Sequence, residues 1–194
     1  MTVYCFRWHK RFLEQTLLLS TWSKYPGHKV GCVICDDDKN QLSGGFNGFP
    51  RNIKDDGRLQ VREKAIKMVV HAEANAIATG ARNGHNLKGG NLYCTHRPCS
   101  QCAALIIQAG IKAVISIWGQ KELSRSGVDW KPEFDFGTEM LMEAGVKVSQ
   151  LDMETLVLWQ PFYDHRHEAS PLSWRGLDQD GKVLLPTSSG HGTV

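Results

Sequence analysis

The 194-residue chain lacks any run near the about 18 apolar residues that a membrane-spanning helix needs. Residues 1–10 lack the apolar stretch of a secretory signal. The chain also lacks a long basic block, because its 23 Lys and Arg are scattered among 20 Asp and Glu and the net charge is only +3. We therefore expect a cytoplasmic protein with no membrane partner and no polymeric nucleic acid as partner, although a small anionic ligand is compatible with this charge.

Disulfides are not expected either, because the six cysteines of a cytoplasmic protein are thiols or metal ligands. The length and the 41% apolar content suit one globular domain with a sizeable core. Apolar periodicity is clear up to residue 152 and weak beyond it. We predict a domain over 1–152 and a C-terminal extension over 153–194, with residues 187–194 disordered.

Hydrophobic periodicity and turn residues predict an alternation of helices and strands. The helices are predicted at 6–22, 71–82, 99–109, 134–144 and 153–163, and the strands at 29–35, 41–46, 90–95, 111–117 and 146–151. The segment 47–62 is predicted to be a long surface loop because Gly, Pro, Asn and Asp are dense in it. A hairpin followed by alternating strands and helices is typical of an α/β layer fold with crossover connections.

Two short motifs carry residues with the chemistry of a catalytic zinc site. They are His71-Ala72-Glu73 and Pro98-Cys99-Ser100-Gln101-Cys102. Catalytic zinc has three protein ligands and keeps its fourth position for water. His71, Cys99 and Cys102 are the three candidate ligands, and Glu73 is the candidate proton shuttle. This H-x-E…P-C-x-x-C order is the signature of zinc deaminases that act on nucleobases.

The predicted helices place the two motifs at helix N-termini, where partial positive charge stabilises thiolates. Cys99 and Cys102 are three residues apart, so their sulfurs share one helix face. His71 and Glu73 would lie about 200° apart on a regular helix. We therefore expect His71 to bend toward the metal from a frayed first turn. Zinc lowers the pKa of bound water to about 7. Glu73 would accept that water's proton, pass it to the ring nitrogen as hydroxide adds to the amidine carbon, and then protonate the departing amine.

Less specific interpretations remain for these and other residues. The motif also suits a structural zinc cluster, or two buried cysteines and a capping histidine. Cys32 and Cys35 form a second C-x-x-C, but strand alternation sends them to opposite faces, so we predict two buried thiols. Cys94 is predicted to be a core residue. His96 is a residue of the pocket mouth or of an ordinary loop, and His165 and His167 are predicted to be solvated.

The resemblance to a known family extends well beyond the zinc motif. Segments 20–24, 29–34, 45–51, 70–77, 92–99 and 105–112 resemble the deoxycytidylate (dCMP) deaminase family, most closely its bacterial and phage members. The similarity covers about residues 8–148. It implies a cytidine-deaminase-like fold, with a five-stranded mixed sheet flanked by helices in three α/β/α layers. It also implies hydrolysis of dCMP to dUMP and ammonia, which supplies thymidylate synthesis.

By the same resemblance, Asn47 contacts the nucleoside and the Ala72 backbone N–H donates to the pyrimidine carbonyl. Family members are commonly hexamers that dCTP activates and dTTP inhibits, with Mg²⁺ on the triphosphate. The resemblance therefore implies an effector site in the loop after Asn47. Its candidate residues are Gly48, Arg51, Asp55, Asp56 and Arg58, and an ordinary solvated loop is the alternative. For the substrate phosphate we predict Ser23, Lys24 and Lys29.

Two residues depart from the family pattern beside the predicted pocket. Arg97 replaces an apolar or small residue next to Pro98, and Trp118 follows a predicted strand; both are candidate substrate contacts. For Trp118, a place in the core is the alternative. These departures leave a 5-substituted dCMP or dCTP open as the substrate. A deaminase acting on tRNA adenosine or polynucleotide cytidine shares the zinc core, but the weak charge argues against it. A non-catalytic zinc module that binds nucleotides would not need Glu73.

Overall fold

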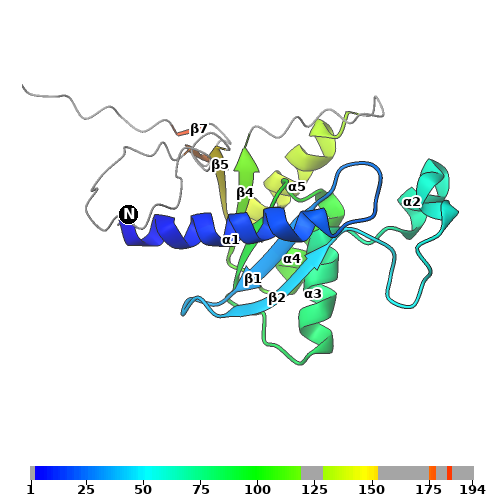
Figure 1. Ribbon diagram of the computed structural model, residues 1–194. Coiled ribbons are helices and arrows are strands. Elements are labelled where there is room, and N and C mark those ends of the chain that lie inside the picture. Colours follow the sequence, from blue (N-terminus) through cyan, green and yellow to red (C-terminus); the bar gives the residue numbers. More distant parts are fainter. Residues whose placement is uncertain (1–2, 119–128, 153–174, 178–182, 185–194) are drawn as a thin grey trace, which may run out of the picture.

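A seven-stranded mixed sheet with helices on both faces organises the chain (Figure 1). The computed structural model describes residues 3–118, 129–152, 175–177 and 183–184. The strands are β1 (Gly31–Cys35), β2 (Gln41–Phe46), β3 (Asn91–Cys94), β4 (Ala113–Trp118), β5 (Lys147–Asp152), β6 (Arg175–Leu177) and β7 (Val183–Leu184). The helices are α1 (Val3–Thr21), the 3-10 helix η1 (Gly57–Gln60), α2 (Arg62–Met68), α3 (Ala72–Arg82), α4 (Ser100–Gln108) and α5 (Lys131–Glu143).

The strand order is β2-β1-β3-β4-β5-β6-β7. Strand β1 is antiparallel to both β2 and β3, whereas β3, β4 and β5 are parallel to one another. The parallel strands are connected through α4 and α5, as crossover connections require. The predicted five-stranded mixed sheet is therefore confirmed, and β6 and β7 add two short antiparallel strands at its β5 edge.

Two apolar cores lie on opposite faces of the sheet. One helix, α1, packs Phe12 and Leu13 against one face. Helices α3, α4 and α5 cover the other face, where Ala76, Ile106 and Leu141 are fully buried. Figure 1 shows this three-layer arrangement, with α1 crossing the sheet on the side away from α3 and α4.

The apolar periodicity located these elements well, since each predicted one within the described residues lies within three residues of its predicted bounds. The second C-x-x-C behaves as predicted, because Cys32 belongs to the core under α3 and Cys35 to the core under α1. Burial raises the pKa of both thiols, that of Cys35 to about 11. Cys94 is fully buried, as predicted. The predicted helix 153–163, the disordered tail, and His165 and His167 lie outside the described residues.

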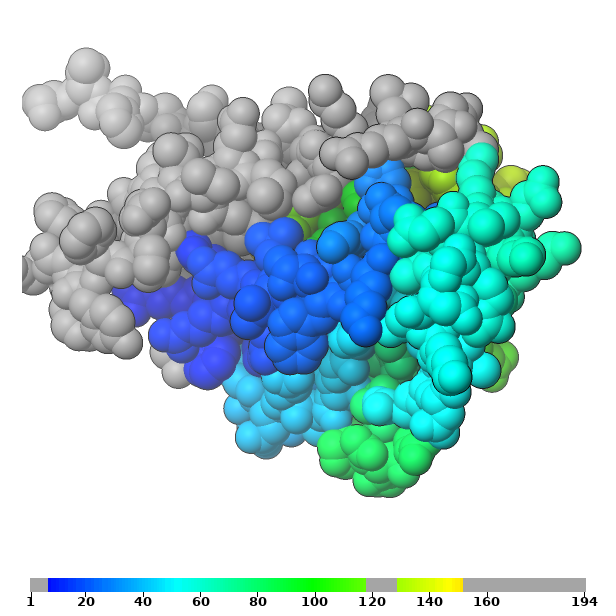
Figure 2. Space-filling view, turned by 45° about the vertical axis from the view of Figure 1, so that its right-hand side comes forward, coloured from blue at the N-terminus to red at the C-terminus, as the bar shows by residue number. Residues whose placement is uncertain are grey.

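The prediction of an unbroken surface loop over 47–62 was wrong. Asp56 accepts a hydrogen bond from the Arg58 backbone and so caps η1, and α2 begins at Arg62. Four and seven residues are too short for a periodic pattern to emerge from the sequence. Figure 2 shows residues around this segment, in cyan, as a lobe at one edge of the molecular surface.

A glycine in β2 allows α3 to lie close against the sheet. A Cβ on Gly45 would lie 2.6 Å from the Ala76 nitrogen and 2.7 Å from the Ala72 carbonyl oxygen. Any larger residue would push α3 outward, so this close packing sets the position of the His71 end of the helix relative to the sheet. Among the described residues, no helix is long and apolar enough to cross a membrane.

Candidate metal and active site

Two helix N-termini position the predicted metal ligands. His71 is the N-cap of α3 and Cys99 is the N-cap of α4, and both have extended backbones, with ψ of 155° and 172°. Neither side chain makes a capping hydrogen bond, so both are available to hold a metal. An N-cap residue does not have helical backbone angles. The angle of about 200° that would separate His71 from Glu73 within a regular helix therefore does not apply here. Both helices begin one residue later than predicted.

The three predicted ligands converge. The Nδ1 atom of His71 lies 3.5 Å from the Sγ atoms of both Cys99 and Cys102. All three ligand atoms lie within 4.8 Å of one another, which makes this the one such His, Cys, Asp and Glu cluster found in the described part of the chain. Tetrahedral zinc with ordinary bond lengths to nitrogen and sulfur separates those atoms by about 3.5 Å. The donor set and its spacing therefore fit zinc with three protein ligands.

The two thiols of the cluster are electrostatically coupled. A hydrogen bond with Cys102, supported by one with His71, lowers the pKa of Cys99. The same hydrogen bond and burial raise the pKa of Cys102. The hydrogen bond to Cys99 raises the pKa of His71. One thiolate thus forms readily, and a cation is needed to hold the second.

Glu73 lies in the first turn of α3 and is only 4% exposed. Burial raises the pKa of its carboxyl group, although nearby His71 and a hydrogen bond with Cys102 offset part of this. A buried carboxyl group beside three candidate metal ligands suits proton transfer near neutral pH.

A cavity of about 350 Å³ opens over this cluster. His71, Ala72, Glu73 and Cys99 form part of its lining. Its remaining walls come from the 25–30 segment, the η1 and α2 segment, the turn after β3 and the start of α5. The volume lies within the usual range for small-molecule sites, which begins at about 300 Å³.

Asn47 lines the cavity and is anchored at both ends of its amide. Its Oδ1 accepts a hydrogen bond from the Val30 nitrogen, and its Nδ2 donates to the His28 carbonyl oxygen, each at 2.8 Å. An amide has two donor hydrogens and two acceptor lone pairs, so one of each remains for a ligand. Ala72 also lines the cavity, and as the first residue of α3 its N–H has no partner within the helix.

The predicted phosphate residues are not part of the cavity lining. Ser23 is buried and donates to the Asn47 carbonyl oxygen at 2.7 Å, so it supports Asn47 from behind. Lys24 is exposed and pairs with Asp55 at 2.8 Å, and Lys29 is exposed. Arg97 does line the cavity, as predicted, and so does His96. Trp118 is the last residue of β4, but its side chain lies outside the described part of the structure.

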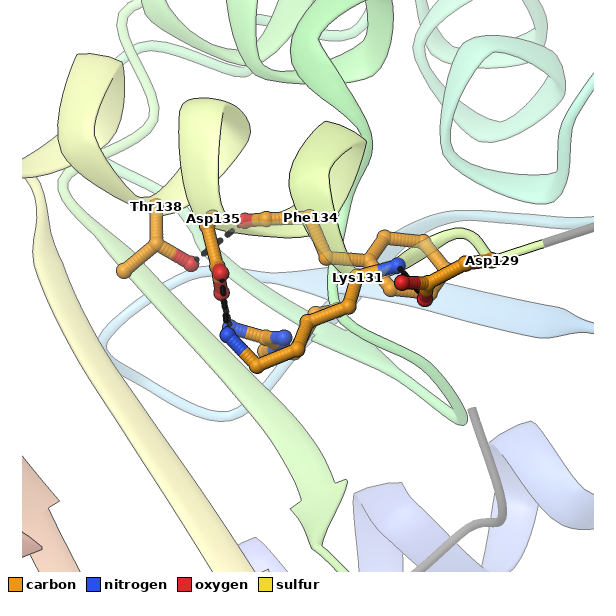
Figure 3. A network of polar contacts seen from close by, with 6 residues as sticks. Asp129, Lys131, Phe134, Asp135 and Thr138 are labelled. Carbon is orange, nitrogen blue, oxygen red and sulfur yellow. Dashed lines mark hydrogen bonds and ion pairs between the residues drawn. The ribbon is translucent and has the colours of Figure 1, made fainter. Parts of the chain in front are cut away.

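Arg97 is held in the cavity wall by α5. Its Nη1 lies 3.0 Å from Asp135 Oδ1, its side chain is 12% exposed, and its guanidinium lies 5.6 Å from the Phe134 ring centroid. Figure 3 shows Asp135 directed at the neighbouring Lys131 on the same helix. Partial burial raises the pKa of Asp135, but hydrogen bonds from Lys131 and Arg97 outweigh it and lower that pKa overall.

The predicted effector residues lie beside the cavity and are not part of its lining. Gly48 forms a two-way backbone pair with Val70, and Arg51 donates to Thr79 at 3.3 Å. Asp55 pairs with Lys24, as above. Asp56 pairs with Arg58 at 2.8 Å, and the hydrogen bond from Arg58 lowers the pKa of Asp56.

Several cavity residues were not predicted. They include Tyr25, His28, Leu59, Arg62, Trp130 and Phe134. They come from separate segments that only the folded chain brings together. The one local signal was Trp130 and Phe134, an aromatic pair four residues apart that stack at 6.4 Å between ring centroids.

Comparison with known proteins identifies the family to which this site belongs. Residues 6–117, more than half of the chain, match the cytidine and deoxycytidylate deaminase zinc-binding region. The chain belongs to the cytidine and deoxycytidylate deaminase family. It is therefore a deaminase, and so a hydrolase, and His71, Cys99 and Cys102 form the candidate metal site of a zinc-binding domain.

Similar members of the deaminase family come from bacteria, animals and phages. An uncharacterized deaminase of Aliivibrio fischeri, encoded in the luxG 3′ region, is 36% identical over 151 residues, covering 77% of this chain and 97% of that protein. A probable deoxycytidylate deaminase of Drosophila melanogaster is 38% identical over 151 residues, covering 72% and 70%. The apo crystal structure of dCMP deaminase from cyanophage S-TIM5 superposes with a TM-score of 0.58 at 25% identity, covering 78% and 100%. The predicted fold is thereby confirmed.

Proposed function

We propose that the chain catalyses the zinc-dependent hydrolytic deamination of dCMP to dUMP and ammonia, supplying dUMP for thymidylate synthesis. The observation that carries this proposal is the buried Glu73 beside a three-ligand cluster at a nucleotide-sized cavity. A closed structural site would have a fourth protein ligand and no need for a buried acid. The names of the relatives support a cytosine nucleotide as substrate.

Each side chain then has a defined task. His71, Cys99 and Cys102 would hold the zinc ion, which would supply a nucleophilic water near neutral pH. Glu73 accepts one proton from the attacking water and delivers it to the ring nitrogen as hydroxide adds to the amine-bearing carbon. It then takes the remaining proton of the added hydroxyl group and gives it to the departing amine, which leaves as ammonia while the carbonyl forms. The raised pKa of Glu73 brings it closer to the working pH for both transfers. The Ala72 N–H donates to the pyrimidine carbonyl, and the free donor and acceptor of Asn47 meet a sugar hydroxyl.

The decisive test is ammonia release from a panel of cytosine and adenine nucleotides by the zinc-loaded protein. We expect dCMP to be the preferred substrate. Glu73→Ala should retain about one zinc ion per chain and lose about 10²- to 10⁴-fold or more in kcat. Loss of zinc from this variant would instead mean that Glu73 is a ligand, and full activity would remove it from the mechanism.

The runner-up is deamination of another cytosine nucleotide, either a 5-substituted dCMP or dCTP. Arg97 favours this alternative, because its side chain lines the cavity and adds a guanidinium group that could contact a ring substituent or further phosphates. Preference for either compound in the panel would select it. Deamination of tRNA adenosine would show in a tRNA assay with strong salt dependence, whereas a KM for dCMP that is insensitive to salt opposes it. A zinc module without activity would release no ammonia from any substrate.

Regulation and assembly are further parts of the proposal. We propose activation by dCTP with Mg²⁺, inhibition by dTTP, and a homohexamer. The ion pairs of Asp55 with Lys24 and of Asp56 with Arg58 are exposed and screened by solvent, so a metal–triphosphate ligand could displace them at little cost. Activity at low dCMP should rise with dCTP and fall with dTTP. Hyperbolic kinetics that neither nucleotide alters would contradict regulation, and sedimentation would report the subunit number.

A further inference from the structure

One cavity residue, His28, carries a buried nitrogen that the fold leaves without a partner. His28 lines the cavity, and its Nε2 atom is inaccessible to solvent and makes no hydrogen bond to any part of the chain that the structure describes. A buried polar group without a hydrogen bond costs free energy, and such groups are rare in folded proteins. Because other atoms of His28 line the cavity, a bound ligand is one source of the missing partner.

The position of His28 relates it to the sugar end of a bound nucleotide. Its carbonyl oxygen accepts the hydrogen bond from Asn47 Nδ2 at 2.8 Å, so the two residues are neighbours in the wall. Asn47 is the proposed sugar contact, whereas the reacting base lies at Glu73. The 5′-phosphate is attached to the sugar, so a group beside Asn47 is within its reach.

The residues around His28 suit an anion. Its ring packs edge-on against His96, with 5.6 Å between centroids. Burial, and then the charge of His28, lower the pKa of His96 to about 4, so His96 is neutral near pH 7. Arg97, from the same turn as His96, adds positive charge that Asp135 partly balances. No carboxylate other than Glu73 is among the described cavity-lining residues.

Building on the proposed function, we propose that His28 donates a hydrogen bond from Nε2 to the 5′-phosphate of bound dCMP. This assigns the phosphate contact to a cavity residue in place of Lys24 and Lys29. Lys24 has a side chain that is 70% exposed and already pairs with Asp55. A hydrogen bond to a phosphate inside a cavity is screened less by solvent than one made by an exposed lysine.

The test compares substrates with and without the phosphate. The kcat/KM of wild type and His28→Ala is measured with dCMP and with deoxycytidine, and the dissociation constants of dUMP and deoxyuridine are measured by calorimetry. We expect His28→Ala to lose about 10- to 100-fold with dCMP and to weaken dUMP to a similar degree. Deoxycytidine turnover and deoxyuridine binding should change less than about threefold. His28→Gln keeps an N–H donor and should recover part of the loss.

His85→Ala is the matched control, because His85 is an exposed histidine beyond the C-terminal end of α3 and contacts the Leu42 carbonyl oxygen. It should leave all four measurements unchanged. Equal losses with and without the phosphate would overturn the inference, as would a phosphate-specific loss in Lys24→Ala that His28→Ala lacks. The proposed function fails separately, since wild type would then not turn over dCMP at all.

Discussion

Gly137 on α5 controls how closely that helix approaches the Cys99 segment, and replacing it with alanine should damage the metal site. Gly137 is buried, and a Cβ there would lie 2.4 Å from the Pro98 carbonyl oxygen and 3.0 Å from that of Cys99. These are backbone atoms of the segment that presents the first thiol. They cannot rotate away as a flexible side chain could.

The size of the effect follows from these distances. The Pro98 oxygen must move by at least 0.6 Å to bring its contact with the new methyl group from 2.4 Å to 3.0 Å. Overpacking of this kind costs about 1–3 kcal/mol, whereas alanine gains at most about 1 kcal/mol in helix propensity over glycine. The clash therefore outweighs the propensity. A shift of catalytic geometry approaching 1 Å costs about 10²-fold, so we expect Gly137→Ala to lose about 10- to 100-fold in kcat/KM.

Three measurements on Gly137→Ala check this reasoning: zinc per chain at limiting zinc, the free energy of unfolding, and kcat/KM for dCMP. All three should fall. Gly57→Ala is the control, because a Cβ at Gly57 would meet no atom within 4 Å, and it should leave all three near wild type. A Gly137→Ala variant with full zinc and activity and higher stability would refute the claim that α5 packing positions Cys99.

Three further predictions concern stability and metal. Burial lowers the pKa of His9 to about 4 from 6.5, so protonation favours the unfolded chain as pH falls through this window. Between pH 7 and pH 5, the free energy of unfolding should fall by about 1 kcal/mol more in wild type than in His9→Leu, a value that is half of what the pKa shift implies because solvent screens the group. Parallel pH profiles of urea unfolding for the two proteins would contradict this. Asn47→Ala removes the hydrogen-bond partners of the Val30 nitrogen and the His28 carbonyl oxygen, and it should lower the free energy of unfolding by about 1–3 kcal/mol. Asn47→Asp should have an intermediate effect, and an unchanged midpoint of urea unfolding in Asn47→Ala would contradict this. Removing zinc with a chelator should abolish activity and lower the midpoint of thermal unfolding, because zinc at 100 times its Kd adds about 2.7 kcal/mol to the free energy of unfolding. Recovery of activity with magnesium instead of zinc would contradict a zinc site.

Much of the fold and the centre of the site were predictable from local sequence. Strand and helix periods located the core elements, and Pro98 before Cys99 indicated a helix start there. The metal residues were predictable because each motif is short and lies at a helix N-terminus. A regular helix would have directed His71 and Glu73 to different sides. This does not happen because His71 is the N-cap of α3 and lies outside the helix proper.

The phosphate end of the site was less predictable. Lys24 and Lys29 were chosen by charge, and their contact with the phosphate stays a prediction. The structure shows only that neither lines the cavity, because burial and side-chain direction, which are not encoded locally, decide the lining. The short elements η1 and α2 also escaped prediction, because their few residues carry no full period. Their residues form part of the cavity wall, so the shape of the substrate site depends on them.

The reactive chemistry follows from two local motifs, since one imidazole, two thiols and a carboxylate at fixed spacings specify a metal and a proton carrier. The layers of the fold follow from the apolar periods of the sequence. Long-range folding determines which side chains line the cavity, such as His28, Leu59 and Trp130. These come from segments far apart in the chain, and their meeting depends on long-range packing rather than on any local pattern. Gly45 and Gly137 show the physical reason: the absence of single methyl groups lets α3 and α5 close around the site.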